Sequence, residues 1–318
     1  MDTMTIKLAT SPTTWGVDFA DAPSNPPWPQ VLDEIAESGI GALELGPVGY
    51  LPEEPKVLHA VIASRRLTAV GSFVFEDFHD PARAAEILAI AERASRAIAA
   101  AGGSVLVIID RPGPERVATA GRGEAARRLT PTRWAVMLDV MQHAAEIARA
   151  HGLRPAIHPH AGGYLEFEDE IERLVADTDL DLCLDTGHLA YAAIDAAAAL
   201  DRYASRLAHV HLKDVDGTVL ARVRNAALDF WTAISEGIFC PLGRGVVDCS
   251  AVLAALERSC YDGFATIEQD RVPGNGSPLE DLRASLAVLE AARELGAQSP
   301  AGRAEGAGAD LTPTTPSD

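Results

Sequence analysis

The chain repeats one hydrophobic pattern along most of its length: a short, continuous apolar run is followed by a longer segment in which apolar residues recur at helical spacing. In the first unit, residues 6–11 form the apolar run, a proline-rich loop follows, and the helical segment ends at Gly39. The pattern predicts strands at residues 6–11, 41–46, 67–75, 104–110, 153–158, 181–185, 207–212 and 264–268. It predicts helices at residues 31–39, 55–66, 81–101, 131–151, 168–176, 192–203, 248–259 and 279–295.

This alternation of strands and helices is typical of α/β proteins. Continuous apolar strands indicate parallel pairing with both faces of the sheet covered. A closed (β/α)8 TIM barrel fits this number of units better than an open doubly wound sheet, and no GxGxxG motif follows the first strand. We therefore predict one domain, a TIM barrel, over residues 1–296.

Three segments depart from the repeat. Residues 111–130 and 213–245, after the fourth and seventh strands, are longer than ordinary connections, so we expect these loops to close over a substrate. Residues 297–318 are rich in Gly, Ala, Pro, Ser and Thr without apolar periodicity, which predicts a disordered tail.

Composition narrows the range of partners. The net charge of −19 argues against nucleic acid and anionic membranes, and leaves a small neutral substrate or a metal cation. No apolar run approaches the ~18 residues of a membrane span, and the N-terminus does not resemble a signal peptide, so we expect a cytoplasmic protein. The four cysteines lack CxxC spacing, which argues against a disulfide framework or a zinc ribbon.

Ionisable residues gather where the expected strands end, and in a TIM barrel the chemistry lies at these C-terminal ends. Each residue alone could be structural; a single histidine such as His209 is more often a satisfied core imidazole. The joint pattern favours a metal site, because four of the nine histidines lie in two HxH segments at strand ends. The strand-end residues are Glu44, Asp110, His158, His160, Asp185, His188, His209, His211, Lys213, Glu268 and Asp270.

Four of these residues, from four successive strands, form the predicted ligand set. Mixed nitrogen and oxygen ligands suit one divalent cation, with manganese or cobalt as first choices and zinc, iron or magnesium as alternatives. Both histidines of an HxH pair point to the same side of a strand, so the second can hold substrate. The predicted ligands are His158, Asp185, His211 and Glu268.

Several stretches carry a family resemblance: HPHAGGYLEFEDEIERL, LCLDTGH, HVHLKDV, GIFCPLGRGVVD and IEQDR, together with the earlier SPTTWGVDF and ALELGPVGYLP. They resemble the inosose dehydratase branch of the xylose isomerase-like sugar isomerase/epimerase superfamily, and the likeness covers nearly all of residues 6–290. It implies a TIM barrel with one divalent metal at its rim. It also implies a polyol or keto-sugar substrate and a homo-oligomer, either a dimer or a tetramer.

The chain departs from the commoner members of that superfamily at one ligand. Ketose 3-epimerases use Glu, Asp, His and Glu, with a further His three residues after the Asp. By motif, Asp185, His188, His211 and Glu268 match, and His158 stands in the position of the first Glu. The two glutamates form the acid/base pair of the epimerases, so this replacement disfavours an epimerase and suits a lyase.

We therefore expect dehydration of a keto-polyol through an enediolate, with a metal ion as Lewis acid. The α-proton would be removed by Glu268, His158 or His160, and the departing hydroxyl would be protonated by His188 or His160.

Two further residues complete the candidate catalytic set. Lys213 could stabilise developing negative charge or could be a solvated loop cation, and Glu44 could orient the substrate ring or transfer a proton. Two other function classes stay open. One is an isomerase, an epimerase or a 3-keto-glycoside β-eliminating lyase at the same metal site. The other is a non-catalytic sugar-binding barrel subunit, against which the retention of all four ligands argues.

Overall fold

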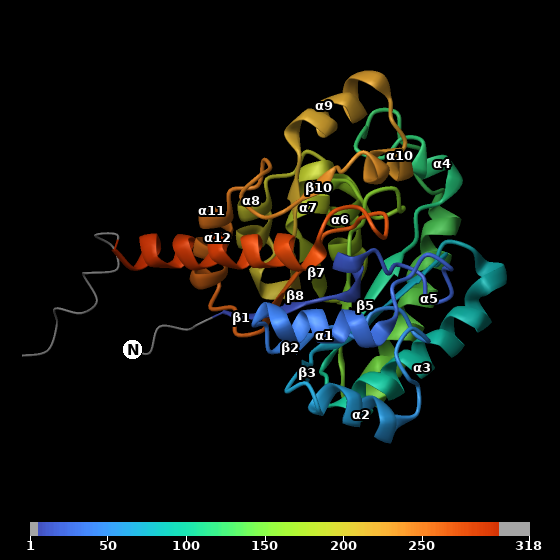
Figure 1. Cartoon of the computed structure of the whole chain (residues 1–318). Coiled ribbons are helices and arrows are strands. Elements are labelled where there is room, and N and C mark those ends of the chain that lie inside the picture. Colours follow the sequence, from blue (N-terminus) through green and yellow to red (C-terminus); the bar gives the residue numbers. More distant parts are fainter. Residues whose placement is uncertain (1–5, 299–318) are drawn as a thin grey trace, which may run out of the picture.

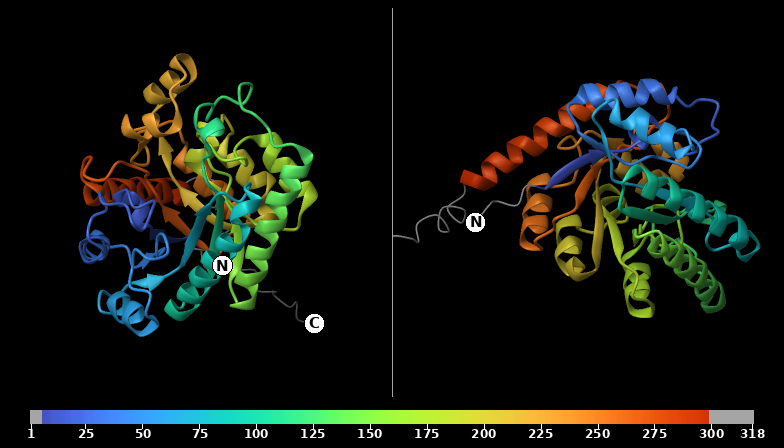
Figure 2. Two further views of the ribbon diagram at one scale, coloured as in Figure 1. Left: turned by 90° about the vertical axis from the view of Figure 1, so that its right-hand side faces the viewer. Right: turned by 90° about the horizontal axis from the view of Figure 1, so that it is seen from below.

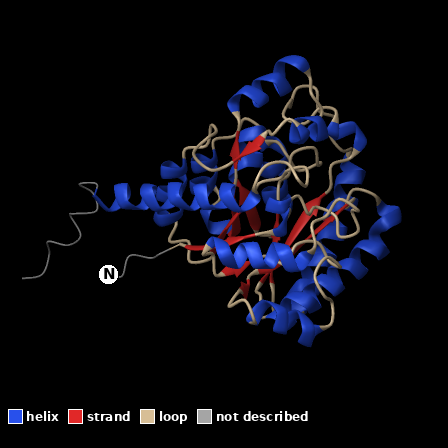
Figure 3. Cartoon of the chain, in the orientation of Figure 1, coloured by secondary structure: helices blue, strands red, loops and turns tan. Residues whose placement is uncertain are grey.

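In a computed structural model of the protein, which describes residues 6–298, parallel strands form an inner barrel and helices form its outer layer (Figure 1, Figure 2 and Figure 3). The strand order is β3-β2-β1-β11-β8-β7-β6-β5-β4. The strands are β1 Lys7–Thr10, β2 Ala42–Leu43, β3 Thr68–Ala69, β4 Gly71–Glu76, β5 Val105–Asp110, β6 Arg154–Ile157, β7 Leu182–Asp185, β8 Leu207–Leu212 and β11 Phe264–Ile267. The predicted barrel and its eight strand positions are thus confirmed.

The third predicted strand is divided into β3 and β4 at Val70, and this division closes the barrel. β3 pairs with β2, whereas β4 pairs with β5 over six residues. The Val70 amide donates to Leu43 O at 2.8 Å, and the Leu45 amide donates to Gly71 O at 2.8 Å, so the β2 segment bonds to both parts. A Cβ at Gly71 would lie 2.4 Å from Val105 O, which explains why glycine stands where the strand bends.

The helices predicted between the strands are present, with ends set by local capping. Thr130 caps α5 by accepting a hydrogen bond from the Arg133 amide, and α3 ends at Gly102, which has a φ of 83°. The main helices are α1 Trp28–Ser38, α2 Pro55–Ala63, α3 Ala84–Ala101, α5 Pro131–Ala150, α6 Glu168–Asp177, α8 Ala196–Arg202, α11 Cys249–Arg258 and α12 Pro278–Gln298. The last helix includes the first two residues of the predicted tail; residues 299–318 lie outside the described part.

Strand β5 shows why the sequence has continuous apolar runs. Val105, Val107 and Ile109 pack into one cluster inside the barrel, whereas Leu106 and Ile108 pack into the larger cluster beneath the helices. All five side chains are buried because each strand is covered on both faces.

The two long excursions build a cap over one end of the barrel, and most of its elements were not predicted. A second apolar cluster joins Ala120 of the first excursion to Tyr191, Phe230 and Phe239. The additional elements are α4 Pro114–Val117, α7 Thr186–Tyr191, β9 Asp214–Val215, α9 Gly217–Ala226, α10 Phe230–Ser235, β10 Phe239–Cys240, and the short 3-10 helices Pro12–Trp15, Pro81–Arg83 and Ala204–Arg206. Among the described helices, none combines the length and apolarity that crossing a membrane requires.

Candidate active site

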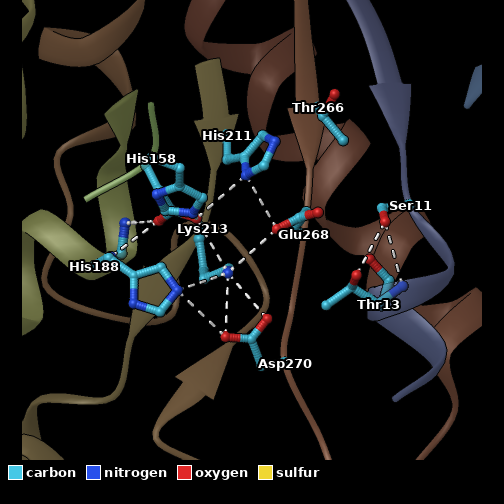
Figure 4. Close-up of polar contacts among 12 residues, drawn as sticks. Ser11, Thr13, His158, His188, His211, Lys213, Thr266, Glu268 and Asp270 are labelled. Atoms are coloured by element: carbon cyan, nitrogen blue, oxygen red, sulfur yellow. Dashed lines mark hydrogen bonds and ion pairs between the residues drawn. The ribbon is translucent and has the colours of Figure 1, made fainter. Parts of the chain in front are cut away.

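Six of the strand-end side chains line a cavity at the capped end of the barrel: His158, His160, His211, Lys213, Glu268 and Asp270. Asp185 and His188 lie beside them without lining the cavity (Figure 4), and Asp110 instead contacts His79 and the Tyr164 amide. One wall is apolar and includes Phe230, Trp231 and Ile234 of α10, so part of the second excursion covers the cavity as expected. The remaining apolar lining residues are Phe73, Phe75 and Ile109. The polar lining residues are Thr13, Asp18, His158, His160, His211, Lys213, Glu268 and Asp270.

The four predicted metal ligands lie side by side. His211 Nδ1 is 3.2 Å from Glu268 Oε2 and 3.8 Å from Asp185 Oδ2. His158 Nε2 is 3.8 Å from the same Asp185 oxygen. All four residues are buried, and each stands at or just beyond the end of a different strand.

Three donor atoms in this group have no hydrogen-bond partner within the described residues. Asp185 Oδ1 accepts hydrogen bonds from the Gly187 and His188 amides and thereby caps α7, but Asp185 Oδ2 is unpartnered. His158 Nδ1 and His211 Nδ1 are unpartnered too. Buried polar atoms normally find hydrogen-bond partners. Asp185 Oδ2 and His211 Nδ1 lie 3.8 Å apart without one, which indicates that this group of mixed nitrogen and oxygen donors fits a divalent cation.

Lys213 is buried among carboxylates, which excludes the alternative of a solvated loop cation. Its Nζ lies 2.9 Å from Asp270 Oδ1, 3.1 Å from Asp185 Oδ2 and 3.3 Å from Glu268 Oε2. Burial alone would lower the pKa of Lys213, but the three carboxylates outweigh burial and raise that pKa well above its ordinary value. The ammonium therefore stays charged and offsets part of the negative charge in the cavity.

Three imidazoles face this charged group in neutral form. Burial lowers the pKa of His158 and of His188 well below the ordinary range, and neighbouring imidazoles add to both shifts. Burial also lowers the pKa of His160 to about 4. Neutral imidazoles can bind a metal or accept a proton, which suits metal binding by His158 and proton removal by His158 or His160. A neutral His188 does not suit the expected protonation of the departing hydroxyl.

Glu44 lies behind His211 and is absent from the cavity lining. Glu44 Oε1 is 2.8 Å from His209 Nε2 and 3.1 Å from His211 Nε2, and Thr266 Oγ1 is 3.1 Å from His209 Nε2. Burial would raise the pKa of Glu44, but the two imidazoles outweigh it and hold that pKa well below its ordinary value. Glu44 therefore contacts the site through an imidazole, and His209 is the satisfied core histidine that a single histidine was expected to be.

A second buried ion pair holds the first excursion in place. Arg116 donates to Glu170 Oε1 at 2.6 Å and to Glu170 Oε2 at 3.1 Å, and it lies 3.3 Å from Glu166 Oε2. Glu166 also accepts hydrogen bonds from the Gly121 and Gly162 amides. Glu166 thus links the first excursion to the turn after His160.

Asp18 lines the cavity but was not among the predicted site residues. It follows η1, the 3-10 helix Pro12–Trp15, whose cap Gly16 sits so close to the backbone that a Cβ would lie 2.7 Å from Arg271 O. Burial raises the pKa of Asp18 to about 8, and Asp270 adds to this shift. Asp18 lies in the loop after β1, which ends at Thr10, so a pattern of ionisable residues close to strand ends does not predict it.

Comparison with known proteins agrees with this architecture. The family model of the xylose isomerase-like TIM barrel matches residues 32–292. An inosose dehydratase of Geobacillus kaustophilus is 32% identical over 257 residues, which cover 78% of this chain and 82% of that protein. The rhizopine catabolism protein MocC of Rhizobium meliloti is 30% identical over 87% of this chain and 85% of its own length.

Among solved structures, a crystal structure of the IolI protein with a bound zinc atom superposes with a TM-score of 0.67. Its sequence identity is 14%, and the match covers 90% of this chain and 98% of that one. At this identity the likeness concerns the fold, whereas the family model and the closer sequences identify the family. The chain belongs to the xylose isomerase-like TIM barrel family, as an inosose dehydratase-like member.

Proposed function

We propose that the protein is a divalent-metal-dependent hydro-lyase that removes water from an uncharged keto-polyol such as inosose. The observation that carries the proposal is the buried group His158, Asp185, His211 and Glu268, in which Asp185 Oδ2 and His211 Nδ1 have no hydrogen-bond partner among the described residues. The identity of 32% to an inosose dehydratase supports the choice of reaction.

The four residues would hold one metal ion, with manganese or cobalt as first candidates. When bound, such an ion supplies Lewis-acid polarisation of a ketone oxygen. The Lys213 ammonium lies within 3.3 Å of Asp185 and Glu268, so it shares two of the proposed ligands. We infer that Lys213 balances these carboxylates before the metal arrives and then pairs chiefly with Asp270.

The cavity suits a ring that bears hydroxyls. Aromatic and aliphatic side chains in the lining exclude water, and the polar side chains of the same lining can bind hydroxyl groups. Among the described residues that line the cavity, Lys213 is the only lysine or arginine. Its charge is already matched by carboxylates, so an uncharged substrate fits better than a phosphorylated one.

The residues around the cavity would have different roles in the reaction. His160 and His188 exchange protons or hydrogen bonds with the substrate, and Lys213 stabilises negative charge that develops on oxygen. Glu268 stands at the metal group and can take part in proton removal. Glu44 orients His211. We further propose, on the family resemblance alone, that the protein acts as a homo-oligomer.

The test uses metal-stripped protein reloaded with Mn²⁺, Co²⁺, Zn²⁺, Fe²⁺ or Mg²⁺ and incubated with 2-keto-myo-inositol. We expect loss of one water by mass spectrometry and a new diketone absorbance, only with metal. An unchanged mass with a changed stereocentre would instead favour an epimerase. Absence of bound metal and of any metal stimulation would refute both enzymatic readings.

A matched pair of variants checks the ligand assignment. His158→Ala should lose metal and activity, whereas His143→Ala should keep both, because His143 lies on the exposed face of α5 with half of its side chain accessible. Full metal content in His158→Ala would show that the ligand set is wrong.

A further inference from the structure

The cavity at the proposed metal group, called the inner cavity below, adjoins a larger one. The two share three lining residues, Asp18, Phe73 and Phe75. The space between atoms, part of it open to solvent, is about 440 Å³ in the inner cavity and about 1010 Å³ in its neighbour. This outer cavity is further lined by Phe19, Ala20, Val48, Glu76, Arg93 and Arg111.

The outer cavity is the main continuation of the inner one. A third cavity lies on the other side of Phe19, but the only lining residue that it shares with the inner cavity is Trp231. Asp18 and Phe75 are only half-buried, so each presents part of its side chain at the junction. A ligand beside the metal group that is longer than one ring would extend past these two residues.

Aromatic rings stand around this junction. The ring centroid of Phe19 is 5.7 Å from that of Phe75 and 6.5 Å from that of Trp231. Trp231 is 38% exposed, which makes it one of the few large hydrophobic side chains on the described surface. Accessible aromatic faces beside a cavity offer a flat apolar surface, and the C–H face of a sugar ring packs against such a surface while its hydroxyls stay in water.

The charges around the outer cavity are already paired, which disfavours an ionic ligand there. Two further acidic side chains, Asp18 and Asp21, also line it and would repel an anion. The ion pairs are Arg93 Nη2 with Glu53 Oε1 at 2.7 Å, Arg111 Nε with Asp77 Oδ1 at 3.0 Å, and Arg83 Nη1 with Glu76 Oε2 at 2.9 Å. An uncharged group rich in hydroxyls therefore fits this cavity better than a phosphate or a carboxylate.

We propose that the outer cavity is a subsite for a second sugar ring, so that the preferred substrate is an O-glycosylated keto-polyol. This inference rests on the proposed dehydration, which takes place in the inner cavity and is unchanged. The glycosyl group is carried on an oxygen that does not react, and it stays attached when water leaves. Asp18 binds a hydroxyl at the junction, and the second ring packs against Phe19 and Phe75.

Binding of two polyols without a ketone tests the subsite apart from catalysis. The probes are myo-inositol and galactinol, which is myo-inositol with a galactosyl group on one oxygen. Isothermal titration calorimetry of the protein supplied with Mn²⁺ measures both affinities. We expect wild-type protein to bind galactinol at least about 10-fold more tightly than myo-inositol, because only galactinol reaches the aromatic junction and the outer cavity.

Variants of the outer cavity should remove this preference. Ala20 lines the outer cavity but not the inner one, so the larger side chain in Ala20→Phe would fill the subsite. Phe19→Ala removes the packing surface, whereas Phe19→Trp keeps one and should retain the preference. The matched control is Ala60→Phe, at an exposed position of α2, which should bind both probes as wild type does. Thermal unfolding of each variant checks that it is folded.

Equal affinities of wild-type protein for galactinol and myo-inositol would overturn the proposal. A preference for galactinol that persists in both Ala20→Phe and Phe19→Ala would also overturn it, because the second ring would then bind elsewhere. Incubation with 2-keto-myo-inositol keeps the two proposals apart. A preference for galactinol without any dehydration would refute the proposed function and leave the subsite standing, whereas dehydration with equal affinities would refute the subsite alone.

Discussion

Glu44 hydrogen-bonds to the ring nitrogen of His211 that points away from the cavity, with Glu44 Oε1 3.1 Å from His211 Nε2. The other ring nitrogen, His211 Nδ1, is directed toward Asp185 and Glu268. A carboxylate in this position keeps the proton on Nε2, fixes the ring orientation and increases the basicity of the nitrogen that would bind a metal. The buried Glu44 thus supports a proposed ligand instead of contacting the substrate.

We predict that Glu44→Gln weakens metal affinity by about 10- to 100-fold, because an amide holds the imidazole less firmly than a carboxylate. Competition with a fluorescent chelator measures this change. The matched control is Glu166→Gln, which makes the same substitution at a buried carboxylate that does not contact the proposed ligands. A Glu44→Gln variant with unchanged metal affinity and reduced kcat would assign Glu44 to proton transfer instead.

Lys213→Met should destabilise the metal-free protein by ~3–5 kcal/mol, since it leaves buried carboxylates without a countercharge. Added metal should restore much of this loss, because Asp185 and Glu268 would then have a cation again. Urea unfolding with metal and with chelator measures both effects. Lys56→Met, at an exposed position of α2, serves as the control. Equal stability of Lys213→Met and wild type in chelator would contradict the charge balance described for this cavity.

The stability of the protein should also depend on the protonation of Glu166. Arg116 already pairs with Glu170, and burial raises the pKa of Glu166 from 4.5 to about 7. A raised carboxyl pKa favours the folded state below pH 4.5, and that contribution is lost as the pH rises through about 7.

Glu166→Gln removes this dependence. We therefore expect the free energy of unfolding of Glu166→Gln, relative to wild type, to rise by up to ~3 kcal/mol between about pH 4.5 and pH 7. Urea unfolding of both proteins in chelator, across this range, tests the sign. Parallel pH profiles would mean that Glu166 stays ionised in the fold.

Asp18 should contribute to substrate binding. It lines the cavity and has no hydrogen-bond partner among the described side chains, so it is free to bind a substrate hydroxyl. Removing one such bond costs about 1.5 kcal/mol, so Asp18→Ala should raise KM by about 10-fold with little change in kcat or metal content. Steady-state kinetics measure this. Asp21→Ala, an exposed position outside this cavity, should leave KM unchanged.

Strand and helix positions followed from local pattern. Residues such as Val105 to Ile109 form an unbroken apolar run because a barrel strand is buried on both faces, and this signal is visible without knowing the neighbours. The C-terminal ends of barrel strands meet at one rim, so the sequence predicts that His158, Asp185, His211 and Glu268 lie together there. In the structure they do.

The hydrophobic pattern did not predict helices that start without a preceding loop, or short helices whose apolar residues pack against distant parts of the chain. Helix α7 begins at Asp185 with no intervening loop, because that carboxylate caps the helix by accepting the Gly187 and His188 amides. Helices α9 and α10 belong to an excursion whose apolar residues pack against Tyr191 and Ala161, which are distant in sequence. Their periodicity was too short to predict a helix without these partners.

The sequence alone determined the barrel, the rim and the residue types available there, because hydrophobic period and strand ends are local properties. Only the tertiary structure decided which way each polar group faces. It placed Glu44 behind His211, surrounded Lys213 with three carboxylates and brought Asp18 into the cavity. These relations depend on distances between strands that are far apart in the chain, and a hydrogen bond has a direction that no spacing of residues encodes.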